Sequence, residues 1–425
     1  MIDIKLIREN KALVKKNIKK KFQEDKLKLV DDVAKLDDEW RKARQEADKL
    51  RAERNKVSMA INLAKKEKRD SSSLLSQAKQ IPKKLAELAE QEKELGEKIR
   101  AILVQLPNIM HKDVPLGKDE SENVERQQFG AKPEFDFKPK NHIELGEELG
   151  LLDFDSSAEA SGKGFYYLKG ELALLNQALI RFSIDKMVKA GFTYTETPLM
   201  LREKVIKNVT DLNDQKNQIY KIEGEDLFLI GTSEHSLIGR FIDTGLKEED
   251  LPIKNASYSM CFRKEIGAHG IEEKGLYRTH QFNKVEMIVI CMPIESEGYF
   301  DQLQNLTVEI FKDLDVPVRV LEMCSGDLGE LKNRQVDIEA WSPIKKEYYE
   351  VGSCSNLTES QARKLKIRAI TKKQEKFIPH TLNNTAIATS RGLVSVMENH
   401  QQKDGSIKIP KALWPYTGFK VIKKK

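Results

Sequence analysis

Cysteine is scarce in this sequence, and long apolar runs are missing. The 425 residues include four cysteines, Cys261, Cys291, Cys324 and Cys354, which lie far apart and form no Cys-x-x-Cys pair. This spacing argues against a disulfide framework or a zinc ribbon and favours a reducing compartment. No run of about 18 apolar residues could span a membrane, and the N-terminal MIDIKLIREN lacks the apolar core of a signal peptide. We therefore expect a cytoplasmic protein.

Charge is abundant but unevenly distributed. Charged residues make up 33% of the chain, and the formal net charge is +6. Residues 1–100 contain 28 Lys and Arg against 19 Asp and Glu, whereas the remaining residues carry 45 basic and 48 acidic side chains. A basic N-terminal module joined to a nearly neutral body indicates either a polyanion-binding appendage or a solvated helical face.

The N-terminal module carries apolar residues at alternating spacings of three and four, which is the pattern of a heptad seam. One seam runs from Val33 to Ala64 and a second from Leu74 to Leu106, with the polar segment KKEKRDSSS between them. This pattern predicts an antiparallel helical hairpin, an arm over about residues 28–104. The arm could bind nucleic acid or serve as a dimerisation or scaffold coiled coil.

Pro82 is an awkward residue within the second seam. It either kinks the second helix or marks its first turn after a looser segment, Ser71–Gln80. The sequence alone does not choose between the two.

The rest of the chain has the pattern of an α+β domain. Prolines and glycines punctuate a linker from Pro107 to Pro139, and a helix is predicted from about Glu171 to Ala190. Runs rich in β-formers follow, separated by turn residues or helical stretches: LFLIGT, ASYSMCF, FNKVEMIVICM, VPVRVLEM, VDIEAWSP and EYYEVGSCS. They predict a largely antiparallel sheet flanked by helices. Neither a Gly-x-Gly-x-x-Gly turn nor a Walker A sequence is present.

Two arginines on neighbouring strand-like runs stand out in residues 258–290. The first run ends in Phe262-Arg263-Lys264-Glu265, and the second opens with Arg278 and contains Phe282 and Glu286. Antiparallel strands can direct both arginines at one point, where the planar guanidinium fork suits a phosphate. Taken singly, each arginine would be an ordinary surface residue.

The order of these residues resembles motif 2 of class II aminoacyl-tRNA synthetases, and two further segments extend the resemblance. GFTYTETPLM, which contains Pro198, looks like part of motif 1 at about 187–200, and HTLNNTAIATSRGLVSVMENHQQ, at about 380–402 with Arg391, looks like motif 3. The segments RAERNKVS, LPNI, VPLGKDESENVE, HQFNKVEM and VGSCSNLTESQARK are similar to the seryl-tRNA synthetase family. The resemblance covers nearly the whole chain. It implies an N-terminal tRNA-binding domain over 1–106 and a class II catalytic domain over 107–425.

The resemblance implies a reaction in which serine and ATP give seryl-adenylate and diphosphate, followed by transfer of serine to the 3′ end of serine tRNA. Arg263, Arg391 and Glu286 are the implied catalytic residues. The implied ATP-binding residues are Arg263, Lys264, Glu265, Arg278, Thr279, Phe282, Glu350, Val351, Gly352, Ser353 and Arg391. The implied serine-binding residues are Thr232, Ser233, Glu234, Glu286 and Thr385. Glu350 and Ser353 match the positions that hold Mg²⁺, which prefers oxygen ligands.

Partners and cofactors follow from the same resemblance. We expect L-serine, ATP, Mg²⁺ and serine tRNA, whose long variable arm the N-terminal arm would contact, and we expect a homodimer; selenocysteine tRNA is a possible further substrate. No zinc is expected, because the zinc-containing branch of the family lacks such an arm. The usual Asn-Gly-Ser-Gly before motif 3 is Asn383-Asn384-Thr385-Ala386 here, which puts the local backbone in question.

Two alternatives come from other classes of protein. A non-catalytic RNA-binding paralogue would be expected to lose Arg263, Glu286 or Arg391, yet all three are present. An amino-acid:carrier-protein ligase of class II ancestry would lack the long arm. Without the resemblance, we would interpret Glu286 as one member of a cross-strand pair and Thr385 as the N-cap of a helix.

Overall fold

The computed structural model describes residues 1–210, 218–265 and 275–424. The chain forms two compact units, Met1–Pro107 and Asn108–Lys425, which are described separately. In the described ranges, no helix is both long and apolar enough to cross a membrane.

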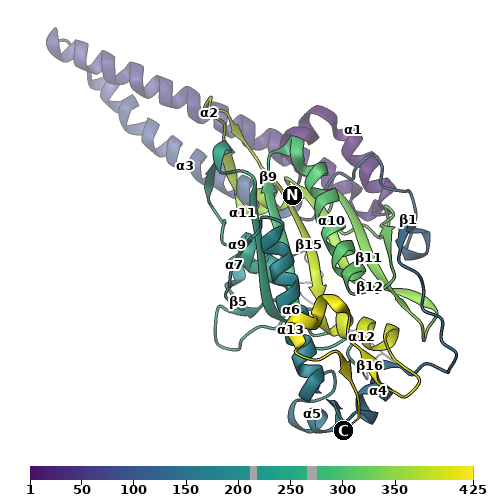
Figure 1. The fold of residues 1–425 in the computed structure, drawn as a ribbon. Helices are drawn as coiled ribbons and strands as arrows, with labels where there is room; N and C mark the ends of the chain where they lie inside the picture. Colours follow the sequence, from purple (N-terminus) through teal and green to yellow (C-terminus); the bar gives the residue numbers. More distant parts are fainter. Residues whose placement is uncertain (211–217, 266–274, 425) are drawn as a thin grey trace. The chain divides into compact units, whose positions relative to one another are not determined.

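The first unit is helical (Figure 1). It contains α1 (Ile4–Lys20), α2 (Leu27–Lys66) and α3 (Ser72–Leu103). The predicted arm is confirmed, since α2 and α3 are two long helices joined by a short polar turn, and α2 buries Val33, Ala43, Ala47 and Val57 along its seam. Their heptad spacing places these residues on one side of the helix.

Pro82 lies inside α3, which already begins at Ser72. Of the two alternatives for Pro82, the one that makes it the first turn of the helix, after a looser Ser71–Gln80 segment, is therefore wrong. Proline cannot donate a backbone hydrogen bond to the preceding turn, so α3 tolerates one missing bond at this point.

The second unit is an α+β fold around one large sheet, as predicted (Figure 1). Its sheet has the strand order β1-β10-β11-β12-β15-β9-β8-β4, and all neighbours are antiparallel except β4 and β8. These strands are β1 (Val124–Phe129), β4 (Thr193–Tyr194), β8 (Ile253–Phe262), β9 (Gln281–Cys291), β10 (Val318–Glu322), β11 (Arg334–Ser342), β12 (Glu347–Thr358) and β15 (His380–Ala388). Part of the predicted linker, Val124–Phe129, is thus an edge strand; its residues are almost all exposed, so it has no apolar alternation to reveal it.

Helices and short strands surround this sheet. The helices are α4 (His142–Glu148), α5 (Asp155–Ser161), α6 (Gly170–Lys189), α7 (Glu203–Val209), α9 (Ser233–Gly239), α10 (Ser296–Asp313), α11 (Ser360–Leu365), α12 (Thr389–Asn399) and α13 (Trp414–Thr417). The smaller strands are β2 (Leu152–Asp153), β3 (Tyr167–Leu168), β5 (Met200–Leu201), β6 (Phe228–Leu229), β7 (Gly245–Lys247), β13 (Arg368–Ile370), β14 (Lys376–Phe377), β16 (Ile407–Lys408) and β17 (Val421–Ile422). The helix predicted from Glu171 to Ala190 corresponds to α6.

The two faces of β9 have different neighbours, because successive side chains of a strand point to opposite sides. Val285, Met287 and Val289 belong to the main core, together with apolar residues of α6, α10 and α12. Ile288 and Ile290 face the other way and pack into a second core, formed with residues of α7, α9 and α11. Lys284 and Glu286 share the parity of Ile288, so they point to this second face, beyond the end of its apolar cover.

Candidate active site

Two neighbouring cavities open on the second face of the sheet. One is lined by Arg263, Arg278 and Arg391, and we call it the arginine cavity. The other has a volume of about 340 Å³ and is lined by five acidic residues, Glu234, Glu286, Glu330, Asp337 and Glu350; we call it the carboxylate cavity. Arg263, Lys284, Glu350 and Thr385 line both cavities, which therefore adjoin along these side chains.

The arginine cavity gathers most of the residues expected to bind ATP. It is lined by Arg263, Glu265, Arg278, Thr279, Phe282, Glu350, Val351, Gly352 and Arg391. Lys264 and Ser353 do not line it. The Lys264 ammonium lies 5.9 Å from the centre of the Tyr220 ring, and Ser353 faces the carboxylate cavity.

Arg263 follows β8 directly and joins the two sides of the site. Its Nε donates to the Gly231 carbonyl at 3.3 Å, and its guanidinium carbon lies 5.3 Å from the centre of the Phe282 ring. The hairpin of β8 and β9 accounts for the second contact, because Cys261, two residues before Arg263, pairs with Phe282. Across the same connection, Arg278 Nη1 lies 3.8 Å from Glu265 Oε2.

Arg391 is held on two sides at the start of α12. Its Nη1 donates to the backbone carbonyl of Glu350 at 2.8 Å and to Glu350 Oε2 at 3.0 Å. Its Nε donates to the Tyr277 carbonyl at 3.4 Å, and its guanidinium carbon lies 4.7 Å from the centre of the Tyr277 ring. Burial is the largest single effect and raises the pKa of Glu350, but the charge and hydrogen bond of Arg391, together with the charges of Arg263 and Lys332, outweigh it and lower that pKa below its ordinary value.

A bulge in β12 turns Glu350 and Ser353 to the same side. Ile338 pairs with Gly352 but Glu339 pairs with Glu350, so Val351 is an extra residue that has no partner in β11. An extra residue resets the alternation of a strand. Val351 and Gly352 are accordingly both buried, whereas Glu350 and Ser353 on either side of them are partly exposed.

Glu286 lines the carboxylate cavity and is fully buried. Lys284 Nζ lies 2.8 Å from its Oε2, Thr385 Oγ1 donates to the same oxygen at 3.1 Å, and Asn383 Nδ2 donates to Oε1 at 3.2 Å. Three donors on one buried carboxylate hold its orientation.

Glu234 and Asp337 are the two carboxylates of this cavity whose pKa is raised. Burial, and then the nearby Glu286 charge, raise the pKa of Glu234 to about 7, although its Oε1 accepts a hydrogen bond from Gln361 Nε2 at 2.8 Å. Burial, and then Glu350, raise the pKa of Asp337 to about 7. Both groups can therefore change charge near neutral pH when a cation arrives.

The remaining residues expected to bind serine have different positions. Thr232 lines the carboxylate cavity and caps α9, its Oγ1 accepting from the Glu234 backbone N–H at 3.3 Å. Ser233 lies outside both cavities; it is fully buried and donates to the Ser257 carbonyl at 3.2 Å. Thr385 lines both cavities.

The two residues that replace the usual glycines before motif 3 point away from the site. Asn384 Nδ2 donates to the Leu303 carbonyl at 2.6 Å and to Thr307 Oγ1 at 2.8 Å, both on α10. Ala386 is fully buried in the main core, at a shift of the β15–β9 register between Thr385 and Ile387. Strand alternation thus leaves Asn383 and Thr385 facing Glu286.

Several residues of the two cavities were not singled out from the sequence. Lys284 and Asn383 could have been found, because each lies two positions before a candidate residue on the same strand face. Asp337 and Tyr277 gave no such signal. Asp337 reaches the site only because β11 pairs with β12, and Tyr277 reaches it only through the path that the chain takes into β9.

The oxygen donors of Glu350 and Ser353 suit a hard divalent cation. The bulge presents a carboxylate and a hydroxyl on one side of β12, and the Ser353 Oγ already accepts from Gln335 Nε2 at 2.9 Å. Mg²⁺ commonly binds one or two protein oxygens and takes its remaining ligands from phosphates and water. Among residues 1–210, 218–265 and 275–424, no three or more His, Cys, Asp or Glu residues are grouped as a metal site.

Comparison with known proteins extends these observations. Residues 218–400 match the family described as tRNA synthetase class II core domain (G, H, P, S and T), and residues 1–110 match the Seryl-tRNA synthetase N-terminal domain. A serine–tRNA ligase of Methanospirillum hungatei is 43% identical over 422 residues, covering 99% of each chain. The crystal structure of seryl-tRNA synthetase from Pyrococcus horikoshii complexed with ATP aligns with a TM-score of 0.94 and 42% identity, covering 100% of both chains.

A more distant relative agrees. The cytoplasmic serine–tRNA ligase from Naegleria fowleri in complex with AMP aligns with a TM-score of 0.89 and 31% identity, over 100% of this chain and 99% of that one. Full-length identity above 40%, together with the matched domains, establishes that the chain belongs to the seryl-tRNA synthetase family of class II aminoacyl-tRNA synthetases.

Proposed function

We propose that this chain activates L-serine with ATP, with the nucleotide in the arginine cavity and serine in the carboxylate cavity, and then transfers serine to serine tRNA. The observation that carries this proposal is that the two cavities adjoin at Arg263, Lys284, Glu350 and Thr385. The α-phosphate and the serine carboxylate would meet there. A carboxylate is ionised at neutral pH, so its attack on phosphorus needs no general base.

On the nucleotide side, catalysis would rest on positioning and charge neutralisation. Arg263 would hold the α-phosphate and Arg391 the distal phosphates. Phe282 would pack against the adenine ring, and Glu265 would accept a hydrogen bond from the adenine amino group. Arg278 and the backbone at Thr279 would complete the contacts with the nucleotide. The support is that all six residues line one cavity whose charge is dominated by guanidinium groups.

On the amino-acid side, carboxylates would bind the ammonium group. Glu286 is fixed by three donors and would orient it, and Glu234 would complete the pairing once ionised. Thr232 and Thr385 would hydrogen-bond the substrate. A site built to pair with the serine hydroxyl should reject alanine, because its own polar groups would then be unpaired.

Glu350 and Ser353 would hold Mg²⁺ in the position that adjoins both cavities. When bound, the ion would neutralise charge on the phosphates. The Glu350 carboxylate is already oriented by Arg391, so the same carboxylate would link the metal position to the arginine that binds the distal phosphates.

The N-terminal arm would bind the long variable arm of serine tRNA, mainly through its sugar–phosphate backbone. The support is the excess of 28 basic over 19 acidic residues in residues 1–100. Such contacts recognise shape more than sequence and weaken with salt.

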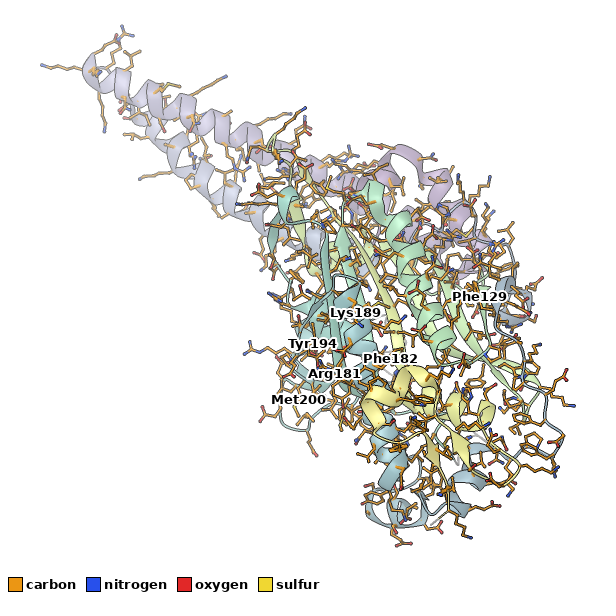
Figure 2. The ribbon with its side chains drawn as sticks, viewed as in Figure 1. Phe129, Arg181, Phe182, Lys189, Tyr194 and Met200 are labelled. Carbon is orange, nitrogen blue, oxygen red and sulfur yellow. The ribbon has the colours of Figure 1, made fainter. Side chains whose placement is uncertain are left out.

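A homodimer would form through the surface of α6, β4 and β5. Leu174, Val188 and Met200 are 55%, 51% and 46% exposed there, a high exposure for large apolar side chains. Figure 2 shows Arg181 and Lys189 on α6, Tyr194 on β4 and Met200 on β5. Val188→Asp should convert the dimer to monomer in sedimentation velocity, whereas Ile294→Asp, at another exposed apolar residue, should not; an unchanged V188D dimer would place the interface elsewhere.

The test of the activity is ATP–diphosphate exchange with each of the twenty amino acids, followed by aminoacylation of serine tRNA. Serine should support the fastest exchange. Exchange with alanine should be slower by about a hundredfold or more, given the loss of a buried hydrogen-bond partner. Exchange with another amino acid at a rate comparable to that with serine would contradict the substrate assignment, and tRNA binding without exchange would favour the non-catalytic paralogue.

A further inference from the structure

A histidine outside both cavities holds the segment that leads into β9. This segment, residues 275–279, is called the return segment here. The Leu276 N–H donates to His142 Nε2 at 3.2 Å, and Leu276 is fully buried. The adjacent Tyr277 supports Arg391 with its carbonyl and its ring. His142 therefore holds the residue next to Tyr277, and Tyr277 in turn positions Arg391.

Glu398 fixes the other side of His142. The imidazole Nδ1 lies 3.0 Å from Glu398 Oε1, and the His142 backbone N–H donates to the same oxygen at 3.2 Å. Ser342 Oγ donates to the second oxygen of Glu398 at 3.0 Å. Glu398 is only 4% exposed, so this carboxylate is a buried acceptor for three donors.

The tautomer of His142 follows from its partners. A backbone N–H can only donate, so Nε2 must carry the lone pair. The proton is then on Nδ1, where it donates to Glu398. Both ring nitrogens therefore have a hydrogen-bond partner, and the two bonds together fix the orientation of the ring.

Arg391 and Glu398 lie seven residues apart on α12 and thus on the same side of this helix. Glu398 holds His142 on α4, which lies beside α12 (Figure 1), and His142 holds Leu276; Arg391 contacts Tyr277. One side of one helix therefore grips two consecutive residues of the return segment, through its own arginine and through the histidine.

The fit at Gly275 is equally close. A Cβ at this position would lie 2.8 Å from His142 Nε2, and the φ of Gly275 is +127°, which disfavours other residues. The imidazole therefore packs directly against the backbone of the return segment.

We propose that His142 and Glu398 are positioning residues for the ATP-binding half of the site. They hold the return segment so that Tyr277 supports Arg391 and so that Arg278 and Thr279 line the arginine cavity. Neither residue lines the arginine cavity or the carboxylate cavity. This inference rests on the proposed function, since it assigns ATP to the arginine cavity.

Two isosteric variants separate the two bonds of the histidine. His142→Asn keeps a donor near the position of Nδ1 but cannot reach Leu276, and it leaves a buried N–H unpaired. His142→Gln places an acceptor near the position of Nε2 and gives up the Nδ1 donor. Ser342→Ala is the control, because it removes a hydrogen bond from the same Glu398 without touching the return segment.

The readouts are KM for ATP and KM for serine in diphosphate exchange, transfer from supplied seryl-adenylate, and thermal unfolding. H142N should raise KM for ATP about tenfold, as expected for a buried donor left unpaired, with KM for serine and the transfer rate within about twofold. H142Q should keep both KM values and the transfer rate within about threefold of those of the parent. S342A should lose thermal stability without a change in KM for ATP.

An unchanged KM for ATP in folded H142N would overturn the proposal, and so would equal losses in H142N and H142Q, or equal rises in both KM values. If H142N does not fold, Glu398→Gln decides: it should raise KM for ATP about threefold and leave KM for serine unchanged, and no effect on ATP would refute the positioning role. Absence of serine-dependent exchange in the unmodified chain would instead count against the proposed function.

Discussion

Arg391 illustrates how a single residue can be tested apart from its charge. Lysine keeps the positive charge but loses the planar fork that donates to two partners at once. If Arg391 braces the ATP phosphates in the transition state, Arg391→Lys should cost about 3 kcal/mol, or roughly a hundredfold in the rate of adenylation. Transfer from supplied seryl-adenylate should be spared, because this step does not use the distal phosphates. Measuring the two half-reactions separately checks the expectation.

Arg363 provides a matched control for this substitution. It lies on α11 outside both cavities, pairs with Glu359 at 2.8 Å, and its side chain is 20% exposed, as is that of Arg391. Arg363→Lys should change adenylation by less than about 1 kcal/mol. Normal adenylation by R391K would remove Arg391 from the proposed site, and equal damage to both half-reactions would indicate a folding defect.

Glu234 should make serine binding depend on pH. Burial and Glu286 raise its pKa to about 7, so below this value the carboxyl is neutral and pairs weakly with an ammonium group. Ionisation above it restores the pairing, so affinity should rise with pH, by about tenfold between pH 6 and pH 8. Calorimetric titration of serine into the protein at several pH values measures this.

The control for the pH effect must separate Glu234 from Asp337, whose pKa is also raised to about 7 in the same cavity. Glu234→Gln should weaken binding and flatten its pH dependence, whereas Asp337→Asn should leave the dependence in place. A steep dependence that survives E234Q but disappears in D337N would transfer the role to Asp337.

Residue identity was predictable where chemistry and strand parity coincide. Arg263, Arg278 and Phe282 were found on the two runs of one hairpin, and they line one cavity. Lys284 was missed although it shares the strand face of Glu286, because a lysine on a strand is ordinarily a surface residue. His142 could not be found, because it acts through Leu276, which lies 134 positions away, and a pairing this distant leaves no local pattern.

Elements were predictable in proportion to their apolar periodicity. The long helices α2, α3 and α6 and the strands β8, β9 and β12 follow runs with clear spacing. Strand β1 is exposed, and several other strands have only two residues, so neither kind carries enough alternation to be recognised. The bulge at Val351, which turns Glu350 and Ser353 together, depends on pairing with β11 and was likewise invisible.

The proline inside α3 allows a test at this scale. Pro82→Ala restores a backbone donor and removes a ring clash, a change worth up to about 3 kcal/mol in a helix interior. Amide hydrogen exchange around residues 78–86 should therefore slow in the full-length variant. Lys84→Ala, at an exposed position two residues away, should change exchange little. Faster exchange in P82A would mean that the proline is accommodated by packing that alanine does not replace.

At the scale of the whole molecule, the two units should be separable in function. The basic excess is confined to residues 1–100, whereas both cavities are built entirely from the second unit. Nothing in the proposed adenylation step uses a residue of the first unit. Activation of serine and recognition of tRNA should thus respond to different deletions.

Deleting Val33–Leu103 and joining the ends should therefore leave serine-dependent diphosphate exchange nearly intact while nearly abolishing tRNA charging. Equal loss of both activities would mean instead that the arm supports the fold of the second unit.

The full-length chain should also bind serine tRNA with an affinity that falls steeply with salt, because phosphate contacts release counterions. Replacing Lys56, Lys65 and Lys66 by Glu should weaken this binding and reduce its salt dependence. The same change at the exposed Lys372, Lys373 and Lys376 of the second unit removes equal charge and should have a much smaller effect. If both triple variants lost affinity equally, net charge alone would explain the binding, and the arm would have no specific role in gripping the tRNA.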